Sequence, residues 1–138
     1  MNHDQPAAPA VPEPNPLMGE ELLVLDSRAF DRTAAFLAPD AVTSYLRTIA
    51  SSGDALLSRL REPNAVLREG HELGEAAHIL AGSAGMLGFE RVATVGRRFE
   101  RAVLTDSADV PGLADGLIAA LELTLQAVDK RKSVPAEA

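Results

Sequence analysis

The 138-residue chain contains no cysteine and no tryptophan, and it has one tyrosine and four phenylalanines. The absence of cysteine excludes disulfide bonds and metal sites built from thiolates. Hydrophobic residues make up 46% of the chain but aromatic residues only 4%. The core must therefore be built from Ala, Leu and Val, which favours packed helices over a β-sheet. The length is enough for one domain of modest size.

Long hydrophobic runs and an excess of positive charge are also missing. No uncharged apolar run approaches the roughly 18 residues of a membrane-spanning helix, and the N-terminus lacks the basic start and apolar centre of a signal peptide. The net charge of −7 argues against nucleic acid or an anionic membrane surface as the main partner. We therefore expect a soluble cytoplasmic protein that binds neither.

Proline is concentrated at the N-terminus, where it is interleaved with alanine. The prolines of this segment are Pro6, Pro9, Pro12, Pro14 and Pro16. Such a composition opposes helix formation and offers little apolar surface to bury, so we expect residues 1–19 to form a disordered or extended tail. Residues 133–138 are expected to form a flexible C-terminus. The folded domain is then expected over residues 20–132.

Hydrophobic periodicity predicts four long helices in this domain, at about residues 39–62, 68–86, 89–103 and 110–132. The first of them keeps its phase through the weak centre at residues 51–54, so one continuous helix is expected there. Amphipathic helices of this length joined by short loops pack most simply as an antiparallel bundle. The sequence thus predicts an all-α fold, an antiparallel up-down four-helix bundle.

A short additional helix is predicted before the bundle. It begins near Ser27, with Asp26 placed to cap its N-terminus. Its inward side chains would be Phe30, Ala34 and either Phe36 or Leu37. We expect this N-terminal helix to cover one end of the bundle.

The third predicted helix of the domain carries a histidine on its exposed side. Its apolar stripe is spaced alternately by four and three residues and consists of Leu73, Ala77, Leu80, Ala84 and Leu87. At about 100° per residue, His78 lies about 140° from the centre of that stripe. Gly82 and Gly85 fall on the same outward side, although each costs about 1 kcal/mol relative to alanine in a helix. The simplest reason for this pair is that a large molecule approaches the imidazole closely.

Three interpretations of the histidine remain open. It is solvated without any chemistry; or it binds Zn²⁺ or Fe²⁺ with His71 and Glu75, although these three residues span about 10 Å along the helix; or it carries a phosphoryl group. A neutral imidazole is a competent nucleophile near pH 7, because the pKa of an unperturbed histidine is about 6.5. Ser83, Arg98 and Arg101 are the candidate hydrogen-bond donors for a phosphoryl group on His78.

The segment from His78 to Gly88 resembles the signature of histidine-containing phosphotransfer (HPt) domains, which reads His, any residue, Leu, Lys, Gly, two small residues and then Leu-Gly. The spaced apolar residues Val92 and Val95, followed by Phe99-Glu100, resemble the next block of that family. The resemblance covers roughly residues 22–128. It implies a monomeric bundle, not an enzyme, that relays phosphoryl groups between receiver domains of two-component systems, with His78 phosphorylated by a phospho-aspartate.

The resemblance also implies roles for neighbouring residues. Glu100 would accept a hydrogen bond from His78 and orient the ring. Side chains around the histidine, such as Glu75 and Ile79, would govern which receivers bind. Mg²⁺ would belong to the receiver, and this chain would need no cofactor or metal of its own.

One position departs from the family pattern. Ala81 stands where the family commonly has the lysine that helps to hold the phosphoryl group. Either Arg98 or Arg101 supplies the missing charge, or the protein binds receivers without efficient transfer. A fragment of an autophosphorylating sensor kinase is a third possibility, but Ile79 replaces the acidic residue that follows the histidine in such kinases, and a Gly-rich nucleotide-binding segment is absent.

Overall fold

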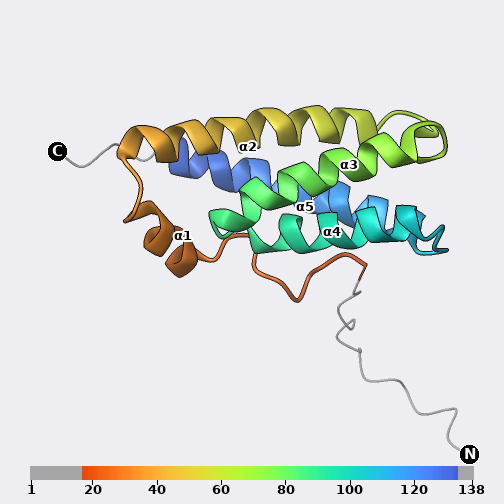
Figure 1. Cartoon of the computed structure of the whole chain (residues 1–138), viewed down its shortest axis with the longest axis horizontal. Helices are drawn as coiled ribbons and strands as arrows, with labels where there is room; N and C mark the ends of the chain where they lie inside the picture. The colour runs from red at the N-terminus through yellow and green to blue at the C-terminus, as the bar shows by residue number, and fades with distance from the viewer. Residues whose placement is uncertain (1–16, 134–138) are drawn as a thin grey trace, which may run out of the picture.

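The computed structural model describes residues 17–133; the predictions for residues 1–16 and 134–138 lie outside the described residues. Within that range the chain forms five helices and no strand: α1 (Ser27–Ala34), α2 (Pro39–Leu60), α3 (Ala65–Met86), α4 (Glu90–Leu104) and α5 (Val110–Ser133) (Figure 1). No helix in this range is long and apolar enough to cross a membrane. The predicted all-α class is confirmed.

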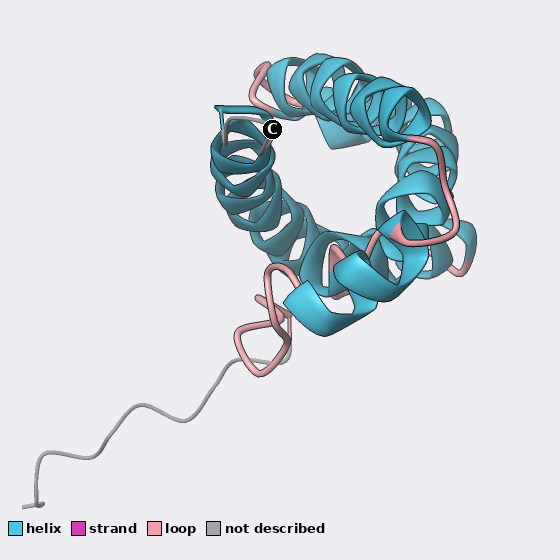
Figure 2. Ribbon diagram, turned by 90° about the vertical axis from the view of Figure 1, so that its left-hand side faces the viewer, coloured by secondary structure: helices cyan, strands magenta, loops and turns pink. Residues whose placement is uncertain are grey.

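The four long helices form a ring in which each helix packs on two neighbours. α3 lies between α2 and α4, and α5 closes the ring against α2 and α4. Figure 2 shows this ring from its end, and Figure 1 shows the short connections that make successive helices antiparallel. The predicted up-down four-helix bundle is confirmed, with α1 at one end of it.

Aliphatic side chains fill most of the core, as the composition predicts. The fully buried aliphatic residues include Leu73, Leu87, Val92, Val95, Leu117, Leu121 and Val128. Where α1 meets the bundle, the rings of Phe30 and Phe89 pack edge to face with their centroids 6.5 Å apart. The guanidinium of Arg131, near the end of α5, lies 4.6 Å from the centre of the Phe30 ring. This cation–π contact fastens α1 to the last turn of α5.

The start of α1 agrees with the sequence, but its end does not. The Asp26 carboxylate accepts a hydrogen bond from the backbone N–H of Ala29, at 3.1 Å, and so caps the helix as predicted. The helix stops at Ala34, and the chain turns before it reaches Phe36, which is 90% exposed. Of the two alternatives for the last inward side chain, Phe36 is therefore wrong, and Leu37 is half-buried.

The long helices differ from the prediction mainly at the start of α3. α2 runs unbroken through residues 51–54, because Leu121 and Leu125 of α5 pack directly on the buried Gly53. α3 begins at Ala65, a turn earlier than expected, but Glu69 departs from helical geometry with φ −135° and ψ 30°. The regular apolar stripe on which the prediction rested begins only after that break.

The Leu-Gly pair that ends the motif of α3 forms the C-cap of that helix. Gly88 has φ +87°; its N–H donates to the carbonyl of Gly85, and the N–H of Phe89 donates to the carbonyl of Ala84. This pairing is a Schellman motif, whose left-handed position favours glycine. The Gly88 carbonyl in turn accepts from the N–H of Asp26 at 2.8 Å, so the cap also holds the segment that leads into α1.

Replacing Thr124 by valine should stabilise the bundle. The Thr124 side chain is buried, and its hydroxyl oxygen has no hydrogen-bond partner among the described residues. Valine keeps the shape and removes the desolvated hydroxyl, so the free energy of unfolding should rise by about 1 kcal/mol. Urea denaturation with an unchanged m-value measures this.

The exposed Thr105 provides the control for that experiment. Its hydroxyl donates to the backbone carbonyl of Arg101 at 2.9 Å. Thr105→Val should change stability by no more than about 0.5 kcal/mol. A loss of stability in Thr124→Val would show that the buried hydroxyl is hydrogen-bonded in solution.

Candidate functional site

The centre of the site is an imidazole on the surface of α3. His78 is exposed, as the helical periodicity predicts, and 64% of its side chain is accessible to solvent. Its Nδ1 atom lies 3.0 Å from Oε1 of Glu100 on α4. The structure thus brings together the two residues that the sequence paired as the phosphorylated group and its orienting partner.

The hydrogen bond between these residues sets which ring nitrogen is available for chemistry. An ionised carboxylate can only accept a hydrogen bond, so Nδ1 of His78 carries the proton and donates it to Glu100. In the neutral ring, the lone pair then resides on Nε2. The geometry therefore presents Nε2 as the nucleophilic atom of an exposed, oriented imidazole.

Close packing of α3 on α4 lets the Glu100 side chain reach the ring. A Cβ atom on Gly74 would lie 3.6 Å from the Cα of Glu100, and one on Gly96 would lie 3.4 Å from the carbonyl oxygen of Ala77. Small residues on both helices thus bring the two backbones together. Glu100 needs that short distance to hold His78 from the neighbouring helix.

The same packing buries the position of the family's lysine. Ala81 is 1% exposed, and its Cβ lies 3.7 Å from the Cβ position on Gly96. The sequence placed Ala81 among the residues around a phosphoryl group, but the side chain points into the interface of α3 and α4. The small alanine at this position therefore lets α3 and α4 pack closely, and it leaves the position without a cation.

The two outward glycines of α3 have different surroundings. Gly82 has open space where a Cβ would stand, with no atom of a neighbouring element within 4 Å. Gly85 is half-buried, and a Cβ there would lie 3.3 Å both from Ala93 Cβ and from Nη2 of Arg97. Gly82 thus leaves the surface of α3 open, whereas Gly85 makes room for α4. That a partner uses the open surface at Gly82 stays a prediction.

Of the candidate donors, Ser83 lies away from the imidazole. It is five residues beyond His78, and therefore about 140° around the helix from it. It is half-buried, whereas the histidine is exposed. The structure does not bring this hydroxyl to the ring.

The two candidate arginines of α4 differ in their surroundings, and a contact of either one with a phosphoryl group stays a prediction. Nη1 of Arg98 lies 3.3 Å from the Glu21 carboxylate, and Arg91 donates to the backbone carbonyl of Leu22, so both hold the N-terminal segment on α4. The pKa of Glu21 is lowered by a hydrogen bond from the backbone, and Arg98 lowers it further. Arg101 is exposed, and no contact in the described part of the chain joins it to His78.

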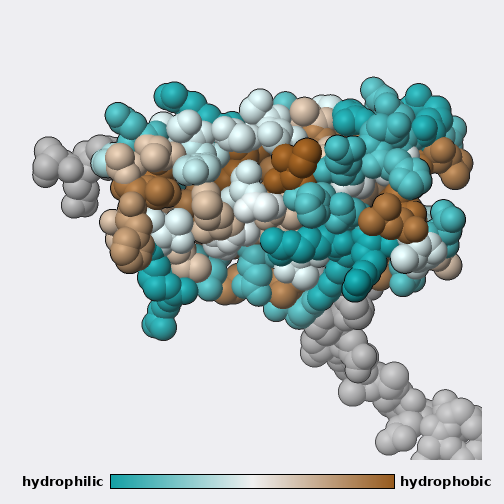
Figure 3. All heavy atoms as spheres, viewed as in Figure 1, coloured by the Kyte–Doolittle hydropathy of each residue, from teal (hydrophilic) through white to brown (hydrophobic). Residues whose placement is uncertain are grey.

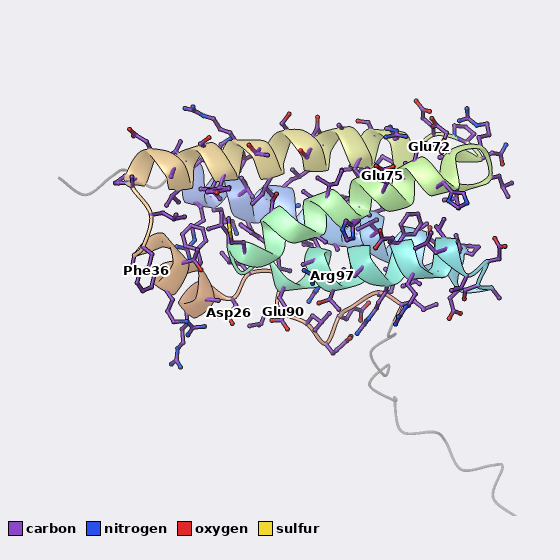
Figure 4. The ribbon with its side chains drawn as sticks, viewed as in Figure 1. Asp26, Phe36, Glu72, Glu75, Glu90 and Arg97 are labelled. Atoms are coloured by element: carbon purple, nitrogen blue, oxygen red, sulfur yellow. The ribbon has the colours of Figure 1, made fainter. Side chains whose placement is uncertain are left out.

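Arg97, which is not among the donors predicted from the sequence, is the arginine that lies against the outward face of α3. Its guanidinium lies beside Gly85, and Figure 4 shows its side chain between α3 and α4. The residue is one turn before Glu100 on α4. That spacing is the signal in the sequence that could have identified it.

Exposed apolar side chains lie on the other side of the histidine, toward α2. We define the His78 face as Glu75, His78, Ile79, Gly82 and Met86 of α3, which fall within about 100° of one another around the helix. Ile79 is 63% and Met86 41% exposed. Figure 3 shows brown patches among polar atoms on this side of the molecule, and Figure 4 places Glu75 on the edge of α3 toward α2. Such a mixed surface is suited to contact with another protein.

The alternative of a metal site is not supported. Among residues 17–133, no three His, Asp or Glu side chains come together in a way that could hold a metal ion. His71 instead borders a surface groove at the far end of the bundle, where the α2–α3 and α4–α5 connections meet. The hypothesis that His71, Glu75 and His78 share one ion is therefore wrong.

Comparison with known families identifies the fold and the motif together. The family model described as the Hpt domain matches residues 43–131, from the first turns of α2 to the end of α5, and this range includes His78 and Glu100. No curated protein and no solved structure matches the chain. Hpt domains are helical bundles that serve as histidine phosphotransfer carriers in two-component systems, and in general they are not enzymes. The chain belongs to the Hpt domain family.

Proposed function

We propose that His78 accepts a phosphoryl group from the phospho-aspartate of one receiver domain and passes it to the aspartate of another. The observation that carries this proposal is the exposed imidazole whose Nδ1–H is held by Glu100, with Nε2 left to react beside the open backbone of Gly82. We further propose that residues 20–132 act as a monomeric carrier in the cytoplasm, without autokinase activity.

The transfer step follows from the protonation of the ring. Nε2 of His78 attacks the phosphorus of the acyl phosphate; the N–P bond forms, and the bond from phosphorus to the aspartyl oxygen breaks. The aspartate carboxylate leaves with the electron pair. Because Nδ1 keeps its proton, the phosphorylated ring carries a positive charge, which the carboxylate of Glu100 stabilises from 3.0 Å. Transfer to a second receiver reverses these events and restores the neutral ring.

The His78 face is the proposed docking surface for the receiver. Its centre is open at Gly82, and apolar area is offered by the exposed Ile79 next to His78 and by the exposed Met86 about two turns further along α3. Glu75 stands at its edge, where a charge influences which receivers bind more than how tightly they bind. The Mg²⁺ that receivers use for this chemistry is expected to be bound by the partner, and Ser83 stands outside this surface.

Phosphotransfer from purified receivers tests the proposal. Incubation with phosphorylated receivers and Mg²⁺ should label the chain within minutes, and incubation with ATP alone should not. The label should be labile in acid and stable in alkali, as expected for phosphohistidine, and peptide mapping should locate it at His78. Tight binding to receivers without any label would instead favour a receiver-sequestering module, which the alanine at position 81 motivates.

Glu100→Ala should slow the transfer without preventing it. The charge-assisted hydrogen bond to Nδ1 is half exposed, so we expect it to contribute about 1 kcal/mol, which corresponds to a three- to tenfold lower single-turnover rate. Nitrogen-15 NMR of His78 should show loss of the single tautomer.

The Glu100→Gln variant distinguishes two contributions of Glu100 to the transfer rate, the orientation of the imidazole ring and the negative charge beside it. The amide oxygen can still accept from Nδ1, so the tautomer should remain fixed while the stabilising negative charge is lost. We expect its rate to lie between those of the wild type and Glu100→Ala. Equal rates in all three proteins would contradict the role assigned to Glu100.

A further inference from the structure

A phosphoryl group on His78 requires a cation that the family's usual position does not supply. Phosphohistidine places two negative charges at the protein surface, and hydrogen bonds from charged donors stabilise such groups most strongly. Ala81 is buried against α4, and Arg98 is engaged with Glu21. The basic side chain that completes the site must therefore come from another position.

The register of α3 against α4 places one arginine level with the histidine. Gly96 packs against Ala77 and Ala81, which lie on either side of His78 along α3. The residue after Gly96 is Arg97, so its backbone is opposite the histidine. It precedes Glu100 by three residues, which places both side chains on the same side of α4.

In the structure, the guanidinium of Arg97 lies against the strip of the α3 surface that also bears His78. Nη2 of Arg97 lies 3.3 Å from the Cβ position on Gly85. Gly85 is seven residues, about two turns, beyond His78 and only about 20° from it around the helix. Between them lies Gly82, where no neighbouring atom stands within 4 Å of the Cβ position. Rotation of the long arginine side chain over this bare backbone brings its guanidinium toward Nε2.

We propose that Arg97 binds the phosphoryl oxygens on Nε2 of His78 and does the work that the family's lysine does from position 81. This inference rests on the proposed function, because it concerns the phosphorylated state of the same histidine. The planar guanidinium can donate two parallel hydrogen bonds to one phosphoryl group. Glu100 balances the positive ring on one side, and Arg97 neutralises the phosphoryl group on the other.

The test compares arginine variants with two phosphoryl donors. Phosphoramidate is a small donor without a docking surface, so its labelling rate reports on chemistry at His78 alone. Arg97→Ala should lower that rate, and the maximal single-turnover rate from a saturating phosphorylated receiver, by at least about tenfold. Arg97→Lys retains a charge and should recover at least about a third of the wild-type rate.

Two further variants test whether the loss of labelling rate is specific to Arg97. Arg101→Ala removes the competing exposed arginine of α4 and should change the labelling rate less than Arg97→Ala does. Lys132→Ala removes a positive charge from the end of α5, and should leave the rate within about twofold of wild type. Circular dichroism melting curves should agree among all four variants, because Arg97, Arg101 and Lys132 are exposed.

The outcomes separate this inference from the proposed function. An Arg97→Ala rate within twofold of wild type, an equal loss in Arg101→Ala, or no recovery in Arg97→Lys would overturn the role of Arg97 alone. The inference would also be overturned if Arg97→Ala changed only the receiver concentration that gives half of the maximal rate and left the maximal rate unchanged. That result would assign Arg97 to docking of the receiver. Labelling of His78 by phosphoramidate but by no receiver would reject the proposed function and leave the Arg97 inference standing. Failure of both donors to label the wild type would overturn both.

Discussion

A His78→Gln variant should take up no phosphoryl group from any receiver. Glutamine has no nitrogen with a free lone pair, so the attack on phosphorus is lost altogether, and the label should fall to background, at least about a thousandfold below wild type. The fold should be unaffected, because the side chain is mostly exposed and its one described hydrogen bond is to Glu100. Its free energy of unfolding should match that of the wild type within about 0.5 kcal/mol.

His71→Gln is the matched control for this variant. His71 is exposed on the same helix and seven residues before His78, but it borders the groove at the far end of the bundle. Removing this imidazole should leave the transfer rate unchanged. Label that persists in His78→Gln and disappears in His71→Gln would reject the assignment of the phosphorylated residue.

The arrangement of the helices could be predicted because it depends on patterns within each helix. The apolar stripe of α3, the cap at Asp26 and the continuous phase of α2 are all local features, and the structure contains each of them. The exposure of Phe36 was not predictable in this way. Whether an apolar residue just past a helix is buried depends on the direction in which the chain leaves, and that direction is set by the packing of α1 on the bundle.

Only those features of the site that depend on a single helix could be predicted from the sequence. Rotation about the axis of α3 predicts that His78 and Gly82 face outward, but it does not say on which side of them the next helix packs. α4 covers the side that bears Ala81 and Gly85 and leaves Gly82 open. That choice depends on contacts between residues far apart in the sequence. The same register explains why Arg97, and neither Arg98 nor Arg101, lies against the outward face of α3.

Gly82→Leu should stabilise the fold and at the same time impair transfer from a receiver. No neighbouring element lies near the Cβ position at Gly82, so a leucine meets no steric conflict within the chain. Leucine is also a better helix former than glycine, and the free energy of unfolding should rise by about 0.5–1 kcal/mol. The same side chain would stand one turn from His78 on the surface where the receiver must approach.

We expect transfer to Gly82→Leu from a phosphorylated receiver to fall by at least about a hundredfold, because a displacement of about 1 Å between reacting groups already costs that much. Labelling by phosphoramidate should fall far less, since a small donor passes the leucine. Gly82→Ala should lie between the wild type and Gly82→Leu, and Gln126→Leu, an exposed change on α5, should transfer normally. A stable Gly82→Leu protein that accepts phosphoryl groups at the wild-type rate would show that the receiver docks elsewhere.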